Sequence, residues 1–195
     1  MGILEVVGFV TGAVCVWLAA RQNIWNFPVG VANNVVFAVL FVVSGLYAGA
    51  ALQVVYLVLG ALGWWWWLRG GTDRGPLQVR PAPRWAWPAA VVAAAVSTAV
   101  LTVVLSTWTD SAVPFWDGLT TGLSLVAQLM LNRKWVGSWY VWIVTDVLLI
   151  GLYVSLGLYL TAALYGVFVV LCVHGLRAWR RAAAQPGPVR VPAVA

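Results

Sequence analysis

The run W-Y-V-W-I-V-T-D-V-L-L-I-G-L-Y, residues 139–153, places a single carboxylic acid, Asp146, inside an almost wholly apolar segment. The rest of the chain is similar in character, because 63% of its 195 residues are hydrophobic and only 8% are charged. Soluble domains are usually about 45–50% apolar and about 25% charged. The composition therefore predicts an integral membrane protein, in which a carboxylic acid within a span needs a specific reason.

Working outward from this run, we find seven segments that are long enough to cross a bilayer, which takes about 20 apolar residues. These segments cover residues 3–20, 28–44, 49–68, 88–106, 115–131, 139–156 and 160–179. The first segment lacks the basic start of a signal peptide, so we interpret it as a span. The sequence predicts an all-α membrane protein with seven transmembrane helices.

The positive charges are segregated with respect to these spans. All 11 Lys and Arg residues lie in the last turn of spans one, three, five or seven or in the segments after them, and none lies at the ends of the other spans that face the opposite side. Cytoplasmic loops carry the excess of Lys and Arg, so we expect the amino terminus outside the inner (plasma) membrane and the carboxy terminus in the cytoplasm. The same distribution argues against a nucleic-acid partner, since the net charge of +6 forms no basic face on a soluble fold.

An internal repeat becomes visible when the chain is aligned with itself, without gaps, so that Arg21 falls on Arg133. The other matched pairs include Gly45-Leu46-Tyr47 with Gly157-Leu158-Tyr159, Gly63 with Gly175, Trp67 with Trp179, and Asn34 with Asp146. Three helices end on the side opposite to their start, and the fourth brings the chain back. The sequence thus predicts parallel repeats in a 3+1+3 arrangement, with a substrate site near the midplane between them.

The repeat divides the chain into five parts. They are a first repeat (1–69), a cytoplasmic linker (70–87), a connecting span (88–106), a second repeat (107–181) and a disordered cytoplasmic tail (182–195).

Two polar pairs occupy equivalent positions of the repeats, Asn33-Asn34 on span two and Thr145-Asp146 on span six. We expect them to face each other across a cavity, although polar residues in membrane helices also serve as interhelical hydrogen bonds. Trp139, Trp142 and Asp146 are spaced by three and four residues and share one helical face. This pattern predicts an aromatic wall, ending in an acceptor, for a planar ring.

Most of Trp64 to Trp67 and the equivalent Trp179 end their spans beside the cytoplasmic interface, which predicts an aromatic belt.

Several function classes are excluded by what the sequence lacks. It contains no nucleotide-hydrolysis loop and no cluster of metal ligands, and its single lysine, Lys134, lies in a loop, where it cannot carry retinal inside a span. We expect no enzyme activity, no cofactor and no bound metal.

Four stretches together resemble the PnuC-type family of vitamin transporters, which includes nicotinamide riboside transporters. They are RQNIWNFPVGVANN (21–34), GLYAGAALQVVYLVLGALGWWWW (45–67), SLVAQLMLNRKWVGSWYVWIVTD (124–146) and GLYLTAALYGVF (157–168). The resemblance implies a SWEET-like fold, often a homotrimer, and facilitated diffusion of an uncharged B-vitamin form that a cytoplasmic kinase traps by phosphorylation. It also implies that substrate is bound by Asn33, Asn34, Gln128, Trp139, Trp142 and Asp146.

The chain departs from the family at two places that bear on the substrate. It has Phe27-Pro28 where the family commonly has Trp-Pro, and Ser138-Trp139 where it commonly has Asn-Trp. Nicotinamide riboside is the first candidate, riboflavin and thiamine are alternatives, and a non-transporting membrane subunit is the alternative outside the class.

Overall fold

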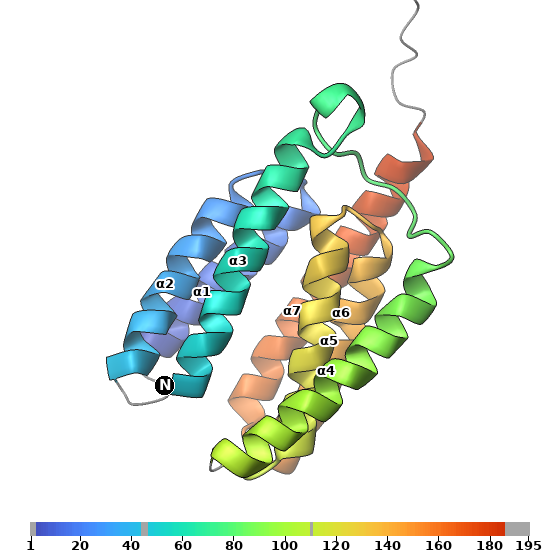
Figure 1. The fold of residues 1–195 in the computed structure, drawn as a ribbon. Helices are drawn as coiled ribbons and strands as arrows, with labels where there is room; N and C mark the ends of the chain where they lie inside the picture. Colours follow the sequence, from blue (N-terminus) through green and yellow to red (C-terminus); the bar gives the residue numbers. More distant parts are fainter. Residues whose placement is uncertain (1–2, 44–46, 110, 186–195) are drawn as a thin grey trace, which may run out of the picture.

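Seven long α-helices run side by side in the computed structural model of the protein (Figure 1). The structure describes residues 3–43, 47–109 and 111–185. The helices are α1 (Ile3–Ala20), α2 (Asn26–Val43), α3 (Tyr47–Arg69), α4 (Ala86–Trp108), α5 (Pro114–Asn132), α6 (Gly137–Ser155) and α7 (Tyr159–Ala184), and a short 3-10 turn, η1 (Thr72–Arg74), follows α3. The prediction of seven helices is confirmed. Gly45-Leu46 and residues 186–195 of the predicted tail lie outside the described residues.

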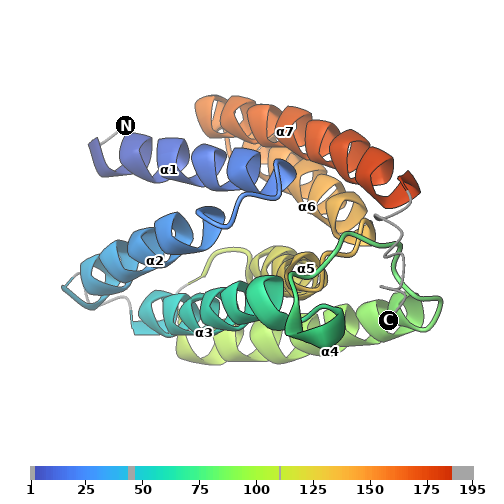
Figure 2. The same ribbon diagram turned by 90° about the horizontal axis from the view of Figure 1, so that it is seen from above.

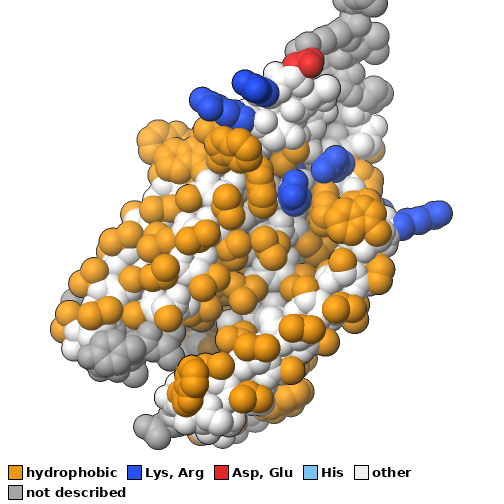
Figure 3. Space-filling view, viewed as in Figure 1, with side chains coloured by type: hydrophobic (Ala, Val, Ile, Leu, Met, Phe, Trp, Pro, Cys, Tyr) orange, Lys and Arg blue, Asp and Glu red, His pale blue; other side chains and the backbone are white. Residues whose placement is uncertain are grey.

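Within the described residues, four of the helices are long and apolar enough by themselves to cross a bilayer. These segments are Ala50–Arg69, Ala86–Trp108, Gly137–Ser155 and Tyr159–Ala184, and shorter apolar stretches cover Val7–Ala20 and Asn26–Val39. Apolar side chains cover the flank formed by α3 and α4, while Lys and Arg gather at one end of the molecule (Figure 3). A flank of this composition is suited to lipid, and a basic end is suited to the cytoplasmic side.

Six helices form a ring, and α4 packs on α5 outside it (Figure 2). Within the ring α2 contacts α1 and α3, and α6 contacts α5 and α7. The two triplets meet where α1 packs against α7 and where α3 packs against α5. A two-fold rotation that exchanges α1 with α5 and α3 with α7 maps one of these junctions onto the other, as parallel repeats require.

The same turn follows the first helix of each triplet. Gln22 and Lys134, which are equivalent in the two repeats, both have the positive φ that non-glycine residues seldom adopt, 56° and 51°. The Gln22 N–H donates to the Ala19 carbonyl over 2.9 Å, and the Lys134 N–H donates to the Leu131 carbonyl over 2.9 Å. The register that the sequence repeat indicates is therefore also the register of the backbone hydrogen bonds.

A cluster of four rings, Phe27, Trp67, Trp139 and Trp179, joins the two triplets at the basic end. Trp67 Nε1 donates to the carbonyl of Leu131 over 3.3 Å, and Trp179 Nε1 donates to that of Ala19 over 3.1 Å. Each indole thus bonds to the opposite triplet. Phe27 meets Trp67 edge-on at a centroid distance of 5.0 Å, and Trp139 meets Trp179 in the same way at 5.3 Å.

The belt prediction is wrong for Trp67 and Trp179, which are only 2% and 0% exposed. The reason is that Gly63 and Gly175 lie one turn earlier on their helices and leave room for the rings of Phe27 and Trp139. Trp64 and Trp65, by contrast, are exposed and remain suited to the interface.

The linker after α3 is tied to the turn between α5 and α6. The Arg80 N–H donates to the Lys134 carbonyl over 3.1 Å, and the Val136 N–H donates to the Arg80 carbonyl over 3.0 Å. Leu77 is buried in the same core as Trp67 and Trp179. The linker therefore forms an ordered strap across the basic end, although the exact domain boundaries remain a prediction.

Candidate functional site

A cavity of about 330 Å³ lies between the two helix triplets, a volume at the lower end of the range for ligand sites. Its lining includes all six residues predicted from the sequence, namely Asn33, Asn34, Gln128, Trp139, Trp142 and Asp146. Other rings and thiols also line it, among them Tyr56, Tyr165, Phe168, Cys15 and Cys172. The structure thus brings the predicted residues together, while their role in binding stays a prediction.

Both members of the first polar pair line the cavity, but only one member of the second pair does. Asn34 and Asp146 occupy equivalent positions and both line the cavity. Thr145 does not line the cavity; its side chain is fully buried, and its Oγ1 donates to the Val141 carbonyl of its own helix over 2.9 Å. Asn33 lines the cavity but also accepts a hydrogen bond from Thr11 Oγ1 over 3.0 Å. This bond joins α2 to α1, so Asn33 has the interhelical role that polar residues of membrane helices can serve instead of facing a cavity.

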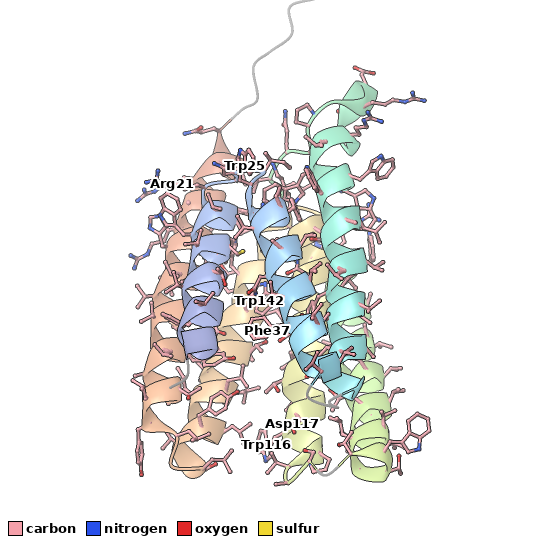
Figure 4. All side chains as sticks on the ribbon, turned by 90° about the vertical axis from the view of Figure 1, so that its left-hand side faces the viewer. Arg21, Trp25, Phe37, Trp116, Asp117 and Trp142 are labelled. Atoms are coloured by element: carbon pink, nitrogen blue, oxygen red, sulfur yellow. The ribbon has the colours of Figure 1, made fainter. Side chains whose placement is uncertain are left out.

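Trp142 supplies a wall to the cavity at the middle of the molecule. Figure 4 shows it at a height between Arg21 and Trp25 at one end and Trp116 and Asp117 at the other. The residue equivalent to Trp142 in the first repeat is Gly30, which also lines the cavity. The indole therefore faces no matching ring from the first repeat, and this asymmetry is suited to a ligand with a single flat face.

Trp139 forms the basic end of the cavity rather than its wall. It is 1% exposed and packs against Trp179, and its Nε1 has no hydrogen-bond partner within the described protein. Phe27, the equivalent residue, also lines the cavity and packs against Trp67. The ring cluster thus closes the cavity toward the basic end.

Asn132 lies outside the cavity lining but supports Gln128, and the sequence reasoning missed it. Its Nδ2 donates to the Leu59 carbonyl over 2.8 Å, and Gln128 Nε2 donates to its Oδ1 over 3.0 Å. Because a carbonyl can only accept, Asn132 must present its oxygen to Gln128, and Gln128 must donate with its nitrogen. These two hydrogen bonds leave Gln128 Oε1 as an acceptor for a ligand. The position lies just beyond the predicted end of span five, so no intramembrane polar signal singled it out.

Asp146 is 4% exposed, and Cys172 Sγ donates to its Oδ2 over 3.5 Å. No lysine, arginine or histidine is present among the described residues that line the cavity.

A second hollow of about 330 Å³ adjoins the cavity between α2 and α3. Asn33, Asn34 and Tyr56 line both spaces, and Phe37 and Gln53 line only the second. In the part of the chain that is described, no three His, Cys, Asp or Glu residues are grouped as a metal site would require.

Known proteins and a family model are similar to this chain in sequence or in fold. The family model described as nicotinamide mononucleotide transporter matches residues 2–181. The nicotinamide riboside transporter PnuC of Escherichia coli (strain K12) is 28% identical over 209 residues, covering 94% of this chain and 87% of the relative. The riboflavin/roseoflavin transporter RibM of Streptomyces davaonensis is 27% identical over 180 residues, covering 90% and 83%.

The fold also matches a solved structure, the crystal structure of the vitamin B3 transporter PnuC. The TM-score is 0.70 at 24% identity, over 92% of this chain and 81% of that chain. The family and its relatives are transporters and not enzymes, so the predicted resemblance and the expectation of no enzyme activity are confirmed. The SWEET-like detail stays a prediction. This chain is a multi-pass membrane protein and belongs to the nicotinamide mononucleotide transporter family.

Proposed function

We propose that the protein carries a B-vitamin, nicotinamide riboside, through the membrane by facilitated diffusion. The observation that carries this proposal is the cavity at mid-height, with an indole wall from Trp142 and polar groups from both repeats. A nicotinamide ring can stack on the indole, since aromatic rings favour offset stacking. Asn34 and Gln128 offer amide groups for the carboxamide and the ribose hydroxyls. The relative PnuC of Escherichia coli, a nicotinamide riboside transporter, supports the same substrate.

Net transport into the cell would depend on the orientation of the protein in the membrane and on phosphorylation of the vitamin in the cytoplasm. We place the amino terminus outside and the basic end in the cytoplasm, as the segregation of all 11 Lys and Arg residues supports. A cytoplasmic kinase that phosphorylates the vitamin would then trap it, because the added negative charge has no compensating cation in the described cavity lining. The resemblance to the family also supports a homotrimer, which native mass spectrometry in detergent tests directly.

Riboflavin is the second candidate, because the relative RibM is named as a riboflavin transporter and is almost as similar to this chain as PnuC. Its three fused rings would use the same wall.

Uptake into liposomes containing the purified protein tests the proposal. Labelled nicotinamide riboside, riboflavin and thiamine are offered in parallel to protein-containing and empty vesicles. We expect nicotinamide riboside to enter until its concentrations inside and outside are equal, and to accumulate beyond that only when a kinase and ATP are enclosed. Uptake of riboflavin alone would favour the second candidate. Uptake of none of the three by folded protein would favour a non-transporting subunit.

A further inference from the structure

We propose that Asp146 is the counter-ion of a positively charged aromatic ligand, so that the cavity selects a cationic ring over a neutral ring of the same shape. The inference rests on the proposed function and adds the charge class of the substrate. It replaces the uncharged solute that the family resemblance implies.

No positively charged side chain of the described cavity lining balances Asp146. The side chain is 4% exposed, and the one hydrogen bond that it receives in the described structure comes from a thiol. The other titratable groups on the lining, Cys15, Tyr56 and Tyr165, cannot carry positive charge. A buried carboxylate without a cation is costly, and in membrane spans such groups often pair with ligands. A cationic ligand would remove that cost at the moment of binding.

The first repeat carries a neutral amide where the second carries Asp146. Asn34 occupies the equivalent position and lines the same cavity. An asparagine has the same shape as an aspartate but no charge, so the architecture of the repeat can be built with an amide at this place. The carboxyl group of Asp146 therefore distinguishes the second repeat from the first, and in its ionised form it makes the second repeat the side that attracts a cation.

Aromatic side chains line the same cavity as the carboxylate. Trp142 lies one turn before Asp146 on α6, and Tyr56, Tyr165 and Phe168 line the same cavity. The faces of aromatic rings attract cations, and enclosed aromatic sites use this attraction to recognise ligands with quaternary nitrogen. A carboxylate and several ring faces together fit an N-substituted heteroaromatic cation.

This chemistry separates the candidate vitamins. The pyridinium ring of nicotinamide riboside and the thiazolium ring of thiamine carry a positive charge, whereas the riboflavin ring is neutral. The reduced form of nicotinamide riboside keeps the ribose and the carboxamide but has a neutral dihydropyridine ring. The oxidised and reduced forms are thus a matched pair of probes that differ mainly in charge.

The test measures binding of both forms to the purified full-length protein and to Asp146→Asn by titration calorimetry. We expect the unchanged protein to bind the oxidised form at least about ten-fold more tightly than the reduced form. Asp146→Asn should weaken binding of the oxidised form by a similar factor and leave the reduced form nearly unchanged. Asn34→Ala is the matched control, because it also lines the cavity and should weaken both forms alike.

Equal binding of both forms by the unchanged protein would overturn the proposal. So would an equal loss for both forms in Asp146→Asn with an unaltered melting temperature, because Asp146 would then be a plain acceptor. Binding of thiamine but not of nicotinamide riboside, lost in Asp146→Asn, would support the charge selection and overturn only the identity of the vitamin. Binding of riboflavin alone would overturn both, and no binding of any vitamin would overturn the transporter proposal itself.

Discussion

The indole of Trp142 has no counterpart in the first repeat, where the equivalent residue is Gly30. At the scale of single residues this makes Trp142 the side chain whose loss should affect ligand stacking most directly. Stacking of a base on an aromatic side chain is worth about 1–3 kcal/mol, so we expect Trp142→Ala to weaken vitamin binding by about 5- to 150-fold.

Trp65→Ala is the control for this measurement by titration calorimetry, since Trp65 is 54% exposed and lies outside the cavity lining. Comparable losses of affinity in both variants would contradict the stacking role.

Asn132 should act on the ligand only through Gln128, because it is fully buried and does not line the cavity. We expect Asn132→Leu to weaken binding by about ten-fold, since a hydrogen bond that holds Gln128 in one orientation is lost. In a Gln128→Leu background the same change should have little further effect on affinity. The double-mutant cycle by calorimetry measures this coupling.

Additive losses in that cycle, together with a lower melting temperature, would mean that Asn132 merely supports the contact between α5 and α3.

The packing of α6 on α7 depends on a glycine. A Cβ at Gly175 would lie 2.6 Å from the Trp139 ring, whereas a Cβ at Gly166 of the same helix would meet nothing within 4 Å. Overpacking a tight site costs about 1–3 kcal/mol. We therefore expect Gly175→Ala to lower the melting temperature, while Gly166→Ala leaves it equal or raises it, since alanine favours helix.

Thermal unfolding in detergent compares the two glycine variants directly. A Gly175→Ala protein as stable as its Gly166→Ala partner would show that the ring cluster adapts freely.

The turn between α5 and α6 carries a buried lysine outside the spans. Lys134 Nζ lies 4.4 Å from the centroid of the Trp67 ring, and burial lowers the pKa of Lys134 to about 8 from a usual value of 10.5. Between these two values the unfolded chain binds more protons than the folded one, so the free energy of unfolding should rise with pH. The contribution is at most about 1.4 kcal/mol per pH unit.

Lys134→Gln introduces the residue of the equivalent position 22, which has the same backbone conformation. Melting temperatures at pH 8 and pH 10 should differ less in this variant than in the unchanged protein. An identical pH dependence in both proteins would assign the effect to other groups.

At the scale of the whole molecule, the two ends of the helix ring should lie on opposite sides of the membrane. Tyr159 begins α7 and is 69% exposed at the end away from the linker, and Gln78 is exposed on the linker. With Cys15 and Cys172 replaced by alanine, we expect Tyr159→Cys to react with a membrane-impermeant maleimide on intact cells. Gln78→Cys should react only after permeabilisation.

The reverse labelling pattern would invert the proposed orientation, and labelling of both positions on intact cells would contradict a membrane-spanning arrangement of the ring.

Much of the fold and of the candidate site follows from local features of the sequence. A span is recognised from its own residues, because lipid requires a continuous apolar helix. Intramembrane polar residues such as Asn34 and Asp146 are rare enough to mark a cavity. The repeat register that matches Arg21 with Arg133 also pairs these two positions, without any knowledge of the packing.

Other features depend on contacts between segments that are far apart in the chain. Trp67 and Trp179 have the composition of belt residues, and only the packing of each against the opposite repeat buries them. The pairing of Asn132 with the Leu59 carbonyl joins residues 73 apart, and no pattern near either residue signals it.

The sequence by itself determined seven helices, two equivalent triplets and a set of polar and aromatic residues that share helical faces, because hydrophobicity and helical period are local properties. Only the tertiary structure decided which of these residues face one cavity, which rings close it, and which amide orients Gln128. Those outcomes depend on how two triplets of limited similarity fit against each other, and shape complementarity between distant segments is not a property of any one segment.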